Sequence, residues 1–413
     1  MTHPDNRQLS GPALANALQD ARARTWALAD DLSDDEWLPP YQNGVNPVAW
    51  ELAHLAWFAE FWILRGPHTR FEGSTGDDLG FAVAHCPPLF LGPDKHLDSA
   101  QLPHADRWTT PLPGRVALKT LLSQQLQACI DAIPDTSAMQ TEQADQALYF
   151  HRLALFHEDM HAEAFCWMRS SLSYAVPAGL VAPSVSAAMR LHVKTGQDGV
   201  DGLEGIAGQG GQVGLGRPAL GNGFSFDNES PPQTLQLAAF DIDSQPVCAL
   251  AFANFLDATG HVAPARWRRD PDNVAAPNQQ SAWQIRWFDG WLAVTSDLPA
   301  LHVNAADADA YCRWTGRRLP TAPEWEHAAR TLAGFAWGHS VWEWTSSSFN
   351  AYPGFAPGPY LEYSQPWFGN HRELRGGAFA THARMHHPSY RNFFLPQRSD
   401  IFSGFRTAAT LAL

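Results

Sequence analysis

The sequence predicts two domains of different fold class, an α-helical domain followed by an α+β domain. Its 413 residues exceed what one ordinary hydrophobic core organises. Up to about residue 172, apolar side chains recur at helical spacing in several long segments. After Gly216 the pattern changes to short apolar runs between turns rich in Gly, Trp and Asn. We therefore expect a helical bundle over residues 1–180, a linker over 181–215 and a second domain over 216–413.

Four long helices are expected in the first domain. They cover Leu14–Asp31, Val48 to about Leu64, Arg115–Ile133 and Glu142–Leu172. The second begins after Asn46-Pro47, and proline is well tolerated in the first turn of a helix. The motif Ser33-Asp-Asp-Glu36 reads as a capping box that opens a short turn. Residues 66–114 show no periodicity and are expected to form a long loop that covers a pocket.

Short helices and strands are expected in the second domain. The helices cover 249–259 and 305–316, and a third begins at Pro323, whereas the tail reads as strands and loops. The glycine-rich stretch 208–216 belongs to the predicted linker. It is not a phosphate loop, because it lacks the GK[ST] motif and a strand–helix frame.

Composition excludes several classes of function. A formal net charge of −14 argues against a partner held by nucleic-acid phosphates. The sequence contains no run of about 18 apolar residues, so no membrane span is expected. The N-terminus lacks the apolar core of a signal peptide. The five cysteines include no CxxC pair, so neither a disulfide framework nor a cysteine zinc site is expected. These features favour a cytoplasmic protein.

A candidate metal site comes from three histidines. His157 and His161 are four residues apart on a predicted helix, which places both imidazoles on one face. His54, on an aromatic-rich helix, could supply a third ligand. Three neutral imidazoles suit zinc, iron, copper or nickel, and the spacing does not choose among them. The alternative is that each is a core histidine satisfied by hydrogen bonds.

The two halves resemble known domains. Asn46-Pro-Val-Ala-Trp-Glu-Leu-Ala-His54 and His157-Glu-Asp-Met-His-Ala-Glu163 resemble a DinB-like four-helix bundle. The second half resembles the formylglycine-generating-enzyme/sulfatase-modifying-factor domain, which has a C-type-lectin-like fold. The motifs include Arg317-Arg-Leu-Pro-Thr321, Val341-Trp-Glu-Trp-Thr345, Leu374-Arg-Gly-Gly377, Tyr390-Arg-Asn-Phe-Phe394 and Phe402-Ser-Gly-Phe-Arg406. Cys248 and Cys312 lie in helical motifs, so the copper chemistry of formylglycine-generating enzymes is not expected.

This pair of domains, in this order, resembles the nonheme iron sulfoxide synthases of ergothioneine biosynthesis. The resemblance implies Fe(II) bound by His54, His157 and His161, with O2 as co-substrate. It implies that a sulfur donor is joined to the imidazole C2 of hercynine, in an active site between the two domains.

The resemblance also implies roles for residues of the second half. A tyrosine donates a proton or an electron, and Tyr360 and Tyr363 are the candidates, with Tyr360 favoured. The segment from Arg391 to Phe394 would meet hercynine. Within it Asn392 would supply a polar contact, and Phe393 or Phe394 a cation–π face for the trimethylammonium group.

The sequence departs from the ergothioneine enzymes where they hold the sulfur donor. Residues 94–113 lack their Asn-Ser-Tyr-Tyr motif and the arginines that bind the donor's carboxylates. In this respect the chain resembles the selenoneine synthases, which join hercynine to a selenosugar through a C–Se bond. A neutral sugar does not need those arginines. Arg65, Arg70 or Arg107 would have to replace them if the donor were instead a thiol with carboxylates.

The sequence is compatible with three candidate functions. The favoured one is an Fe(II)- and O2-dependent enzyme that acts on hercynine and a selenosugar. The second uses the same scaffold with a thiol donor, γ-glutamylcysteine or cysteine, to form a sulfoxide. The third is a non-catalytic binding module in which the histidines are structural. No nucleic-acid or membrane partner is expected for any of them.

Overall fold

The computed structural model of the chain describes residues 6–70, 82–188, 190–193, 211–271 and 281–410. It divides into two compact units. The helical unit comprises Met1–Ala178, Pro218–Asp227 and Pro357–Gln365. The second unit comprises Gly179–Arg217, Asn228–Ala356 and Pro366–Leu413.

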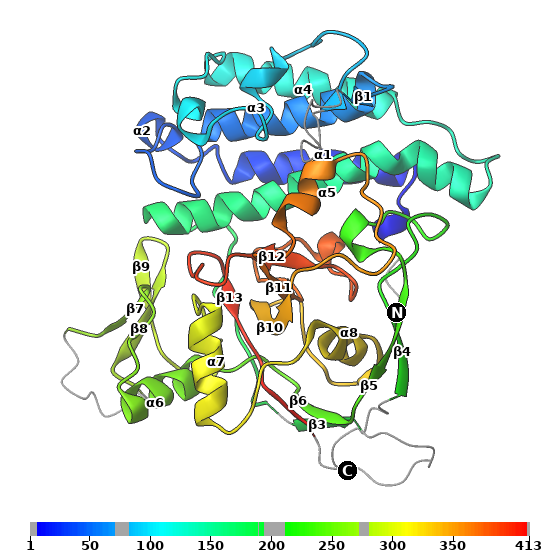
Figure 1. Ribbon diagram of the computed structural model, residues 1–413. Coiled ribbons are helices and arrows are strands. Elements are labelled where there is room, and N and C mark those ends of the chain that lie inside the picture. Colours follow the sequence, from blue (N-terminus) through cyan, green and yellow to red (C-terminus); the bar gives the residue numbers. More distant parts are fainter. Residues whose placement is uncertain (1–5, 71–81, 189, 194–210, 272–280, 411–413) are drawn as a thin grey trace. The chain divides into compact units, whose positions relative to one another are not determined.

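Four long helices lie side by side in the helical unit (Figure 1). They are α1 (Gly11–Ala27), α3 (Val48–Ala59), α4 (Arg115–Asp131) and α5 (Thr141–Leu172), close to the expected ranges. Helices α1 and α3 each pack against both α4 and α5. The chain continues from α3 into a π-helical turn, η2 (Glu60–Leu64). The short helix α2 (Asp34–Trp37) carries the predicted capping box, which is confirmed.

Helix α3 is the most deeply buried of these helices. From Leu52 to Ala59 every residue is buried, whichever way it faces. A helix that is apolar all round belongs inside a core, so a polar side chain on it has to find its partners there. Glu51 and His54 are two such side chains, and both become part of the site described below.

The predicted loop over 66–114 is largely irregular. It contains the paired strands β1 (Thr69–Arg70) and β2 (Ala82–Val83) and the short helices η3 (Asp94–His96) and η4 (His104–Trp108). Residues 71–81 lie outside the described part of the chain. Two indole N–H groups of α3 attach this segment to the helix. Trp50 Nε1 donates to His96 O at 2.9 Å, and Trp57 Nε1 donates to Asp94 Oδ1 at 2.8 Å.

Two segments expected in the second domain belong instead to the helical unit, and this corrects the predicted boundaries. Residues 218–227 are tied to α5, because the backbone N–H groups of Gly221 and Gly223 donate to Asp145 Oδ2 at 3.0 and 2.9 Å. Residues 357–365 follow, because Ser364 Oγ donates to Asp227 Oδ1 at 2.5 Å. These bonds join residues far apart in sequence, which no local pattern reveals.

Among its described residues, the second unit is built on small sheets and three α-helices (Figure 1). The helices are α6 (Ala249–Thr259), α7 (Ala305–Trp314) and α8 (Ala322–Thr331), as expected. The largest sheet has the order β12–β11–β10–β13, and a second has the order β14–β6–β3. Their strands are β10 (Trp342–Ser348), β11 (Arg372–Arg375), β12 (Asn392–Phe394), β13 (Ser403–Gly404), β3 (Arg190–Val193), β6 (Phe240–Asp243) and β14 (Ala408–Thr410). Strands β7 (Trp267–Arg269), β8 (Trp283–Trp287) and β9 (Gly290–Ala293) form a third sheet.

The predicted linker is partly structured, which is a further correction. Within 181–215, β3 pairs with β6, and β4 (Gly211–Leu215) pairs with β5 (Gln233–Leu237). In β4 the side chains of Val213 and Leu215 are buried between exposed positions. This alternation of buried and exposed residues is typical of a strand, although the surrounding glycines mask it in the sequence. Residues 189 and 194–210 lie outside the described part of the chain.

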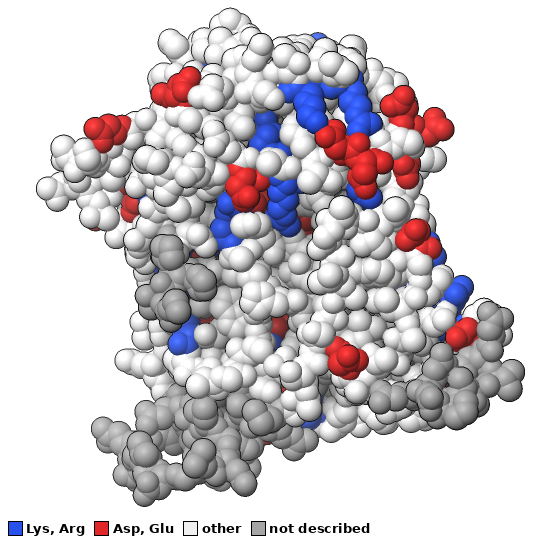
Figure 2. Space-filling model, turned by 180° about the vertical axis from the view of Figure 1, so that it is seen from behind, with Lys and Arg blue, Asp and Glu red and all other residues white. Residues whose placement is uncertain are grey.

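Three further observations concern the helices, one face of the surface and the cysteines. No helix among the described residues combines the length and apolarity needed to cross a bilayer. On the face shown in Figure 2, the basic side chains gather mainly in the upper half, with acidic side chains beside them. All five cysteines are free thiols.

Candidate metal centre

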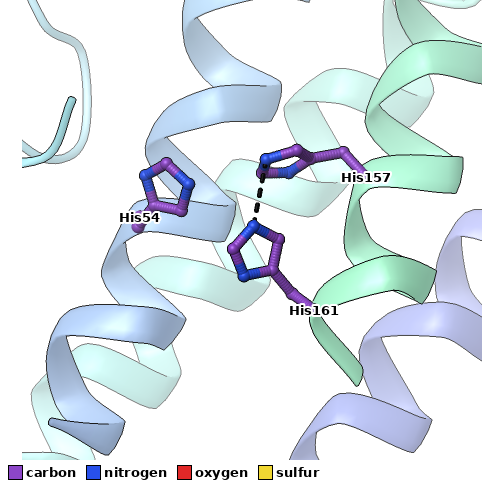
Figure 3. Close-up of side chains that lie close together, drawn as sticks. All are labelled: His54, His157 and His161. Carbon is purple, nitrogen blue, oxygen red and sulfur yellow. Dashed lines mark hydrogen bonds between the residues drawn. The ribbon is translucent and has the colours of Figure 1, made fainter. Parts of the chain in front are cut away.

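Three histidines from two helices converge in the helical unit. His54 comes from α3, and His157 and His161 come from α5, with their rings turned toward one another (Figure 3). One ligand atom of each lies within 4.8 Å of the others. The Nε2 atoms of His157 and His161 are 3.2 Å apart, as two bonds of about 2.1 Å to one ion would require if they met at roughly 100°. The arrangement predicted from spacing is therefore present as geometry.

Burial keeps two of these rings neutral. His54 and His157 are buried, whereas the side chain of His161 is 22% exposed. Burial, followed by the effect of the neighbouring His161 ring, lowers the pKa of His54 to about 3. The same causes hold the pKa of His157 well below its usual value. A neutral imidazole is the form that donates a lone pair to a metal.

Each histidine ring is supported on a different side. His54 Nδ1 lies 2.7 Å from Leu97 O, and the Trp50 ring stacks on the imidazole at 5.0 Å with an interplanar angle of 7°. The His157 ring lies flat against Phe58, with centroids 3.6 Å apart and an interplanar angle of 6°. Packing and hydrogen bonds therefore restrict the orientation of both rings before any ion is bound.

His161 is supported by a carboxylate. Its Nδ1 lies 2.5 Å from Glu51 Oε1, and Glu51 is buried. Burial raises the pKa of Glu51, but the His161 ring, His54 and the Asn46 amide outweigh burial and lower it to about 2. The sequence analysis did not predict that Glu51 would contact a histidine of the cluster. The signal was available in Glu51-Leu-Ala-His54, where positions i and i+3 share one helix face.

A pocket opens beside His54 within the helical unit. Aromatic side chains of α3 and η2 line it, together with Tyr360, Ala82 and several polar side chains. The lining residues are His54, Trp57, Phe58, Phe61, Trp62, Ala82, Asp98, Ser99, Tyr360 and Glu362. The Asp98 carboxylate accepts hydrogen bonds from Ala100 N–H and Gln101 Nε2. Burial raises the pKa of this carboxyl group. The lining contains two carboxylates and no lysine or arginine among the described residues.

The two candidate tyrosines lie in different surroundings. Tyr360 packs edge-on against Phe58 at 5.1 Å and against His157 at 6.2 Å between ring centroids, and it lines the pocket. Tyr363 stacks on Phe226 at 4.5 Å, and its hydroxyl lies 3.8 Å from Met160 Sδ. Tyr360 is thus the tyrosine beside the histidine cluster. Both belong to the helical unit.

The residues expected to meet hercynine belong to the second unit. Arg391 is buried there, and its guanidinium donates to Asn228 O at 2.6 Å, Asn350 O at 2.8 Å and Glu373 Oε2 at 2.9 Å. The ring of Tyr352 covers one of its faces, with the guanidinium carbon 4.1 Å from the ring centroid. Arg391 therefore serves the core of this unit, which argues against its predicted contact with a substrate.

The neighbours of Arg391 along the chain are also engaged within the second unit. Asn392 Oδ1 accepts the N–H of Phe393 at 2.9 Å. The ring of Phe393 stacks on Phe349 at 4.0 Å, and the Arg398 guanidinium lies 4.7 Å from the centroid of Phe394. A protein cation thus already occupies the cation–π position predicted for a ligand at Phe394. The predicted contacts of Asn392, Phe393 and Phe394 with hercynine stay predictions.

Comparison with known proteins assigns both parts of the chain. Residues 17–165 match the DinB superfamily, and residues 202–340 and 338–411 match the sulfatase-modifying factor enzyme 1-like domain. The molecule is therefore a DinB-type helical bundle with a histidine cluster, joined to a domain of the formylglycine-generating-enzyme type. Because the second match spans more than half of the chain, the protein belongs to the sulfatase-modifying factor enzyme 1-like family.

Three relatives show how far the likeness extends. Proteins called hercynine oxygenase from Mycolicibacterium smegmatis and Mycolicibacterium thermoresistibile are 28% and 29% identical. Each alignment covers 96% of this chain, with 98% and 94% of the two relatives. A formylglycine-generating enzyme from Streptomyces coelicolor is 29% identical, over 46% of this chain and 84% of that enzyme. The hercynine oxygenases thus match both units, whereas the last relative matches less than half of the chain.

Proposed function

We propose that this protein is an iron- and O2-dependent oxidoreductase that joins the imidazole C2 of hercynine to the selenium of a selenosugar. The observation that carries the proposal is the convergence of three imidazoles, two of them held neutral by burial. Sequence similarity also supports the proposal, because proteins called hercynine oxygenase match the chain over nearly its whole length. The third function considered above, a binding module with structural histidines, would not need lone pairs that converge on one point.

The histidine cluster fits a divalent transition metal. His54, His157 and His161 would hold the ion, and three nitrogen ligands leave coordination positions open for substrates. When bound, Fe(II) supplies the redox chemistry that activates O2, which organic side chains do not provide. The aromatic rings of Trp57, Phe58 and Phe61 beside His54 would limit the access of water to this region.

Tyr360 would act as the proton donor. Burial, with a further contribution from Glu362 and Asp98, raises the pKa of its phenol. The phenol therefore keeps its proton at neutral pH and can donate it through Oη. Its packing against Phe58 and His157 holds the ring at the edge of the cluster.

The proposed reaction balances without a further reductant. Joining C2–H to a selenol removes two hydrogen atoms with two electrons, whereas full reduction of O2 takes four electrons. The other two electrons come from selenium as it becomes a selenoxide. One oxygen atom then remains on selenium and the other leaves as water.

The surroundings of the pocket support a donor without carboxylates. The Arg65 guanidinium forms a two-point ion pair with Asp94, at 2.7 and 2.9 Å. Arg107 donates to Asn46 Oδ1 and stacks over Trp50. Arg65 is therefore neutralised by a carboxylate, and Arg107 is engaged by the Asn46 amide and the Trp50 ring. The side chain of Arg70, the third candidate, lies outside the described residues.

Carboxylates in a pocket suit a ligand with many hydroxyl groups. Asp98 and Glu362 line the pocket together with Ser99. Carboxylate oxygens accept hydrogen bonds from sugar hydroxyls, whereas they repel the carboxylates of γ-glutamylcysteine. The second candidate, a thiol donor that gives a sulfoxide, is retained because the hercynine oxygenases match the chain over nearly its whole length.

A donor-swap assay tests the proposal. The iron-loaded protein is incubated with hercynine and O2, together with either a selenosugar or γ-glutamylcysteine. We expect hercynine-dependent O2 uptake and a C–Se product with the selenosugar, and a slower reaction with the thiol. Faster turnover of the thiol would favour the second candidate. Absence of O2 uptake with either donor would refute the enzymatic proposal.

A further inference from the structure

Two of the three histidines are backed by groups of different charge. The ring of His54 faces a neutral backbone carbonyl, that of Leu97, at 2.7 Å. The ring of His161 faces a carboxylate, that of Glu51, at 2.5 Å. A carboxylate behind an imidazole fixes its tautomer and raises the basicity of its other nitrogen, whereas a carbonyl does so more weakly. The histidines are therefore not equivalent as ligands.

Glu51 is itself held in place on its other oxygen. Asn46 Nδ2 donates to Glu51 Oε2 at 2.7 Å, and Arg107 Nη1 donates to Asn46 Oδ1 at 2.8 Å. Arg107 is in turn fixed by Ser99 O at 3.2 Å and by the Trp50 ring, whose centroid is 4.3 Å from its guanidinium carbon. The carboxylate that faces His161 thus belongs to a chain of three side chains with an anchored end.

The charge of Glu51 is balanced at His161. The carboxylate is 1% exposed, and a buried charge is costly without a partner. Among the described residues its ion pair is with His161, whereas the hydrogen bonds of Arg107 lead to it through the amide of Asn46. The carboxylate thus lies on the Nδ1 side of the His161 ring, and Nε2 of the same ring faces His157 in the cluster.

We propose that Glu51 is a positioning residue for the metal. Its carboxylate accepts Nδ1–H of His161, so that the Nε2 lone pair is directed into the cluster, and Asn46 and Arg107 hold the carboxylate in register. His161 is accordingly the strongest donor among the three histidines. This inference rests on the proposed metal-dependent function. It assigns Arg107 to the support of the metal centre, where a role in binding a donor had been considered.

The test measures affinity for Fe(II) and Co(II) in three variants of Glu51 and a matched control. In Glu51→Gln the shape is kept and the charge is lost, Glu51→Ala removes the hydrogen bond, and Glu51→Asp keeps the charge. We expect Glu51→Gln and Glu51→Ala to bind each metal about 10–100-fold more weakly, and Glu51→Asp to recover part of the loss.

Glu60→Gln is the control. Glu60 is a buried carboxylate on the same helical segment, and it accepts the N–H groups of Leu89 and Phe90, at 2.7 and 3.1 Å. The loss of a buried charge that does not face a histidine should leave metal affinity unchanged. If Glu60→Gln weakened metal binding as much as Glu51→Gln, the effect would be one of folding and the inference would be overturned.

The visible spectrum of bound Co(II) gives a second readout, because it reports the ligand field and not stability. We expect the bands to shift in Glu51→Gln and to coincide with those of the wild type in Glu60→Gln. Unchanged affinity and unchanged bands in Glu51→Gln would overturn the role of Glu51 and leave the proposed function intact. Failure of the wild-type protein to bind either metal would overturn both.

A variant that leaves Glu51 unchanged tests the same inference if Glu51→Gln does not fold. Asn46→Ala leaves Glu51 in place and removes the amide that holds its second oxygen. We expect a smaller loss of metal affinity, together with a Co(II) spectrum shifted in the same direction. Wild-type affinity and an unshifted spectrum in Asn46→Ala would contradict the proposed chain from Arg107 to His161.

Discussion

Each unit contains a buried polar cluster, and the groups of the two clusters are satisfied in different ways. In the helical unit, the rings of His54, His157 and His161 bring lone pairs together. In the second unit, the buried cluster consists of carboxylates and guanidinium groups that neutralise one another. Arg375 binds Glu326 at 3.0 Å and Glu373 at 2.6 Å, and Arg391 binds Glu373 at 2.9 Å. Arg406 and Glu343 form a further buried ion pair.

This difference separates a structural network from a prepared site. A buried carboxylate that has its guanidinium is satisfied within the protein, and it ties loops together without any ligand. The lone pairs of converging neutral imidazoles do not satisfy one another, so they require a shared proton or a bound ion. The histidine cluster therefore offers ligands to a cation from outside, whereas the carboxylates of the second unit's network already have guanidinium partners. Each prediction below tests one side of this contrast.

The largest effect is expected from His157→Ala. The change removes one of three converging ligands, and we expect the iron content after loading and desalting to fall to background, with loss of O2 uptake. His151→Ala is the matched control, because His151 is a buried histidine on the same helix whose Nε2 contacts Cys129 O at 3.1 Å. It should retain iron. Retention of iron in His157→Ala would make the cluster structural.

A large loss of stability is expected from Arg391→Met. The variant leaves the Glu373 carboxylate buried with one fewer cation, so its free energy of unfolding should fall by about 3–5 kcal/mol in urea titrations. The double variant with Glu373→Gln should recover part of that loss. A stable Arg391→Met protein with a raised KM for hercynine would instead restore the substrate contact predicted from sequence.

A purely catalytic effect is expected from Tyr360→Phe. The phenyl ring remains to pack against Phe58, so iron content should be unchanged, whereas kcat should fall by about 100-fold because the proton donor is lost. Tyr363→Phe is the control, since its hydroxyl contacts Met160 and not the cluster. Equal losses in the two variants would reject the assignment of Tyr360.

The smallest effect concerns pH. Burial raises the pKa of Glu373, but Arg391 and Arg375 outweigh burial and hold it below its ordinary value of 4.5. A carboxyl group whose pKa is lowered by folding stabilises the folded state above the unfolded pKa, and this contribution is lost as the pH falls through the folded pKa. The urea midpoint should therefore decline below pH 4.5, and less steeply in Glu373→Gln. Parallel declines would argue against this source.

Much of the fold was predictable because its signals are local. The ranges of α1, α3, α4 and α5 follow from helical periodicity, and the capping box at Ser33 follows from four consecutive residues. Boundaries decided by distant contacts were not predictable. The placement of 218–227 with the helical unit depends on Asp145, more than 70 residues away. The pairing of β4 with β5 was hidden by glycines in the sequence.

The sequence by itself determined which residues could act as ligands. The spacing of His157 and His161 fixes two imidazoles on one helix face, since the helical repeat is a property of the backbone. Only the tertiary structure decided how those ligands are held. It set Phe58 against His157, Glu51 behind His161, and Tyr360 beside the cluster while Tyr363 faces Met160. It also placed Arg391 in a salt-bridge core. Burial and charge pairing depend on which segments pack together, and that packing is settled across the whole chain.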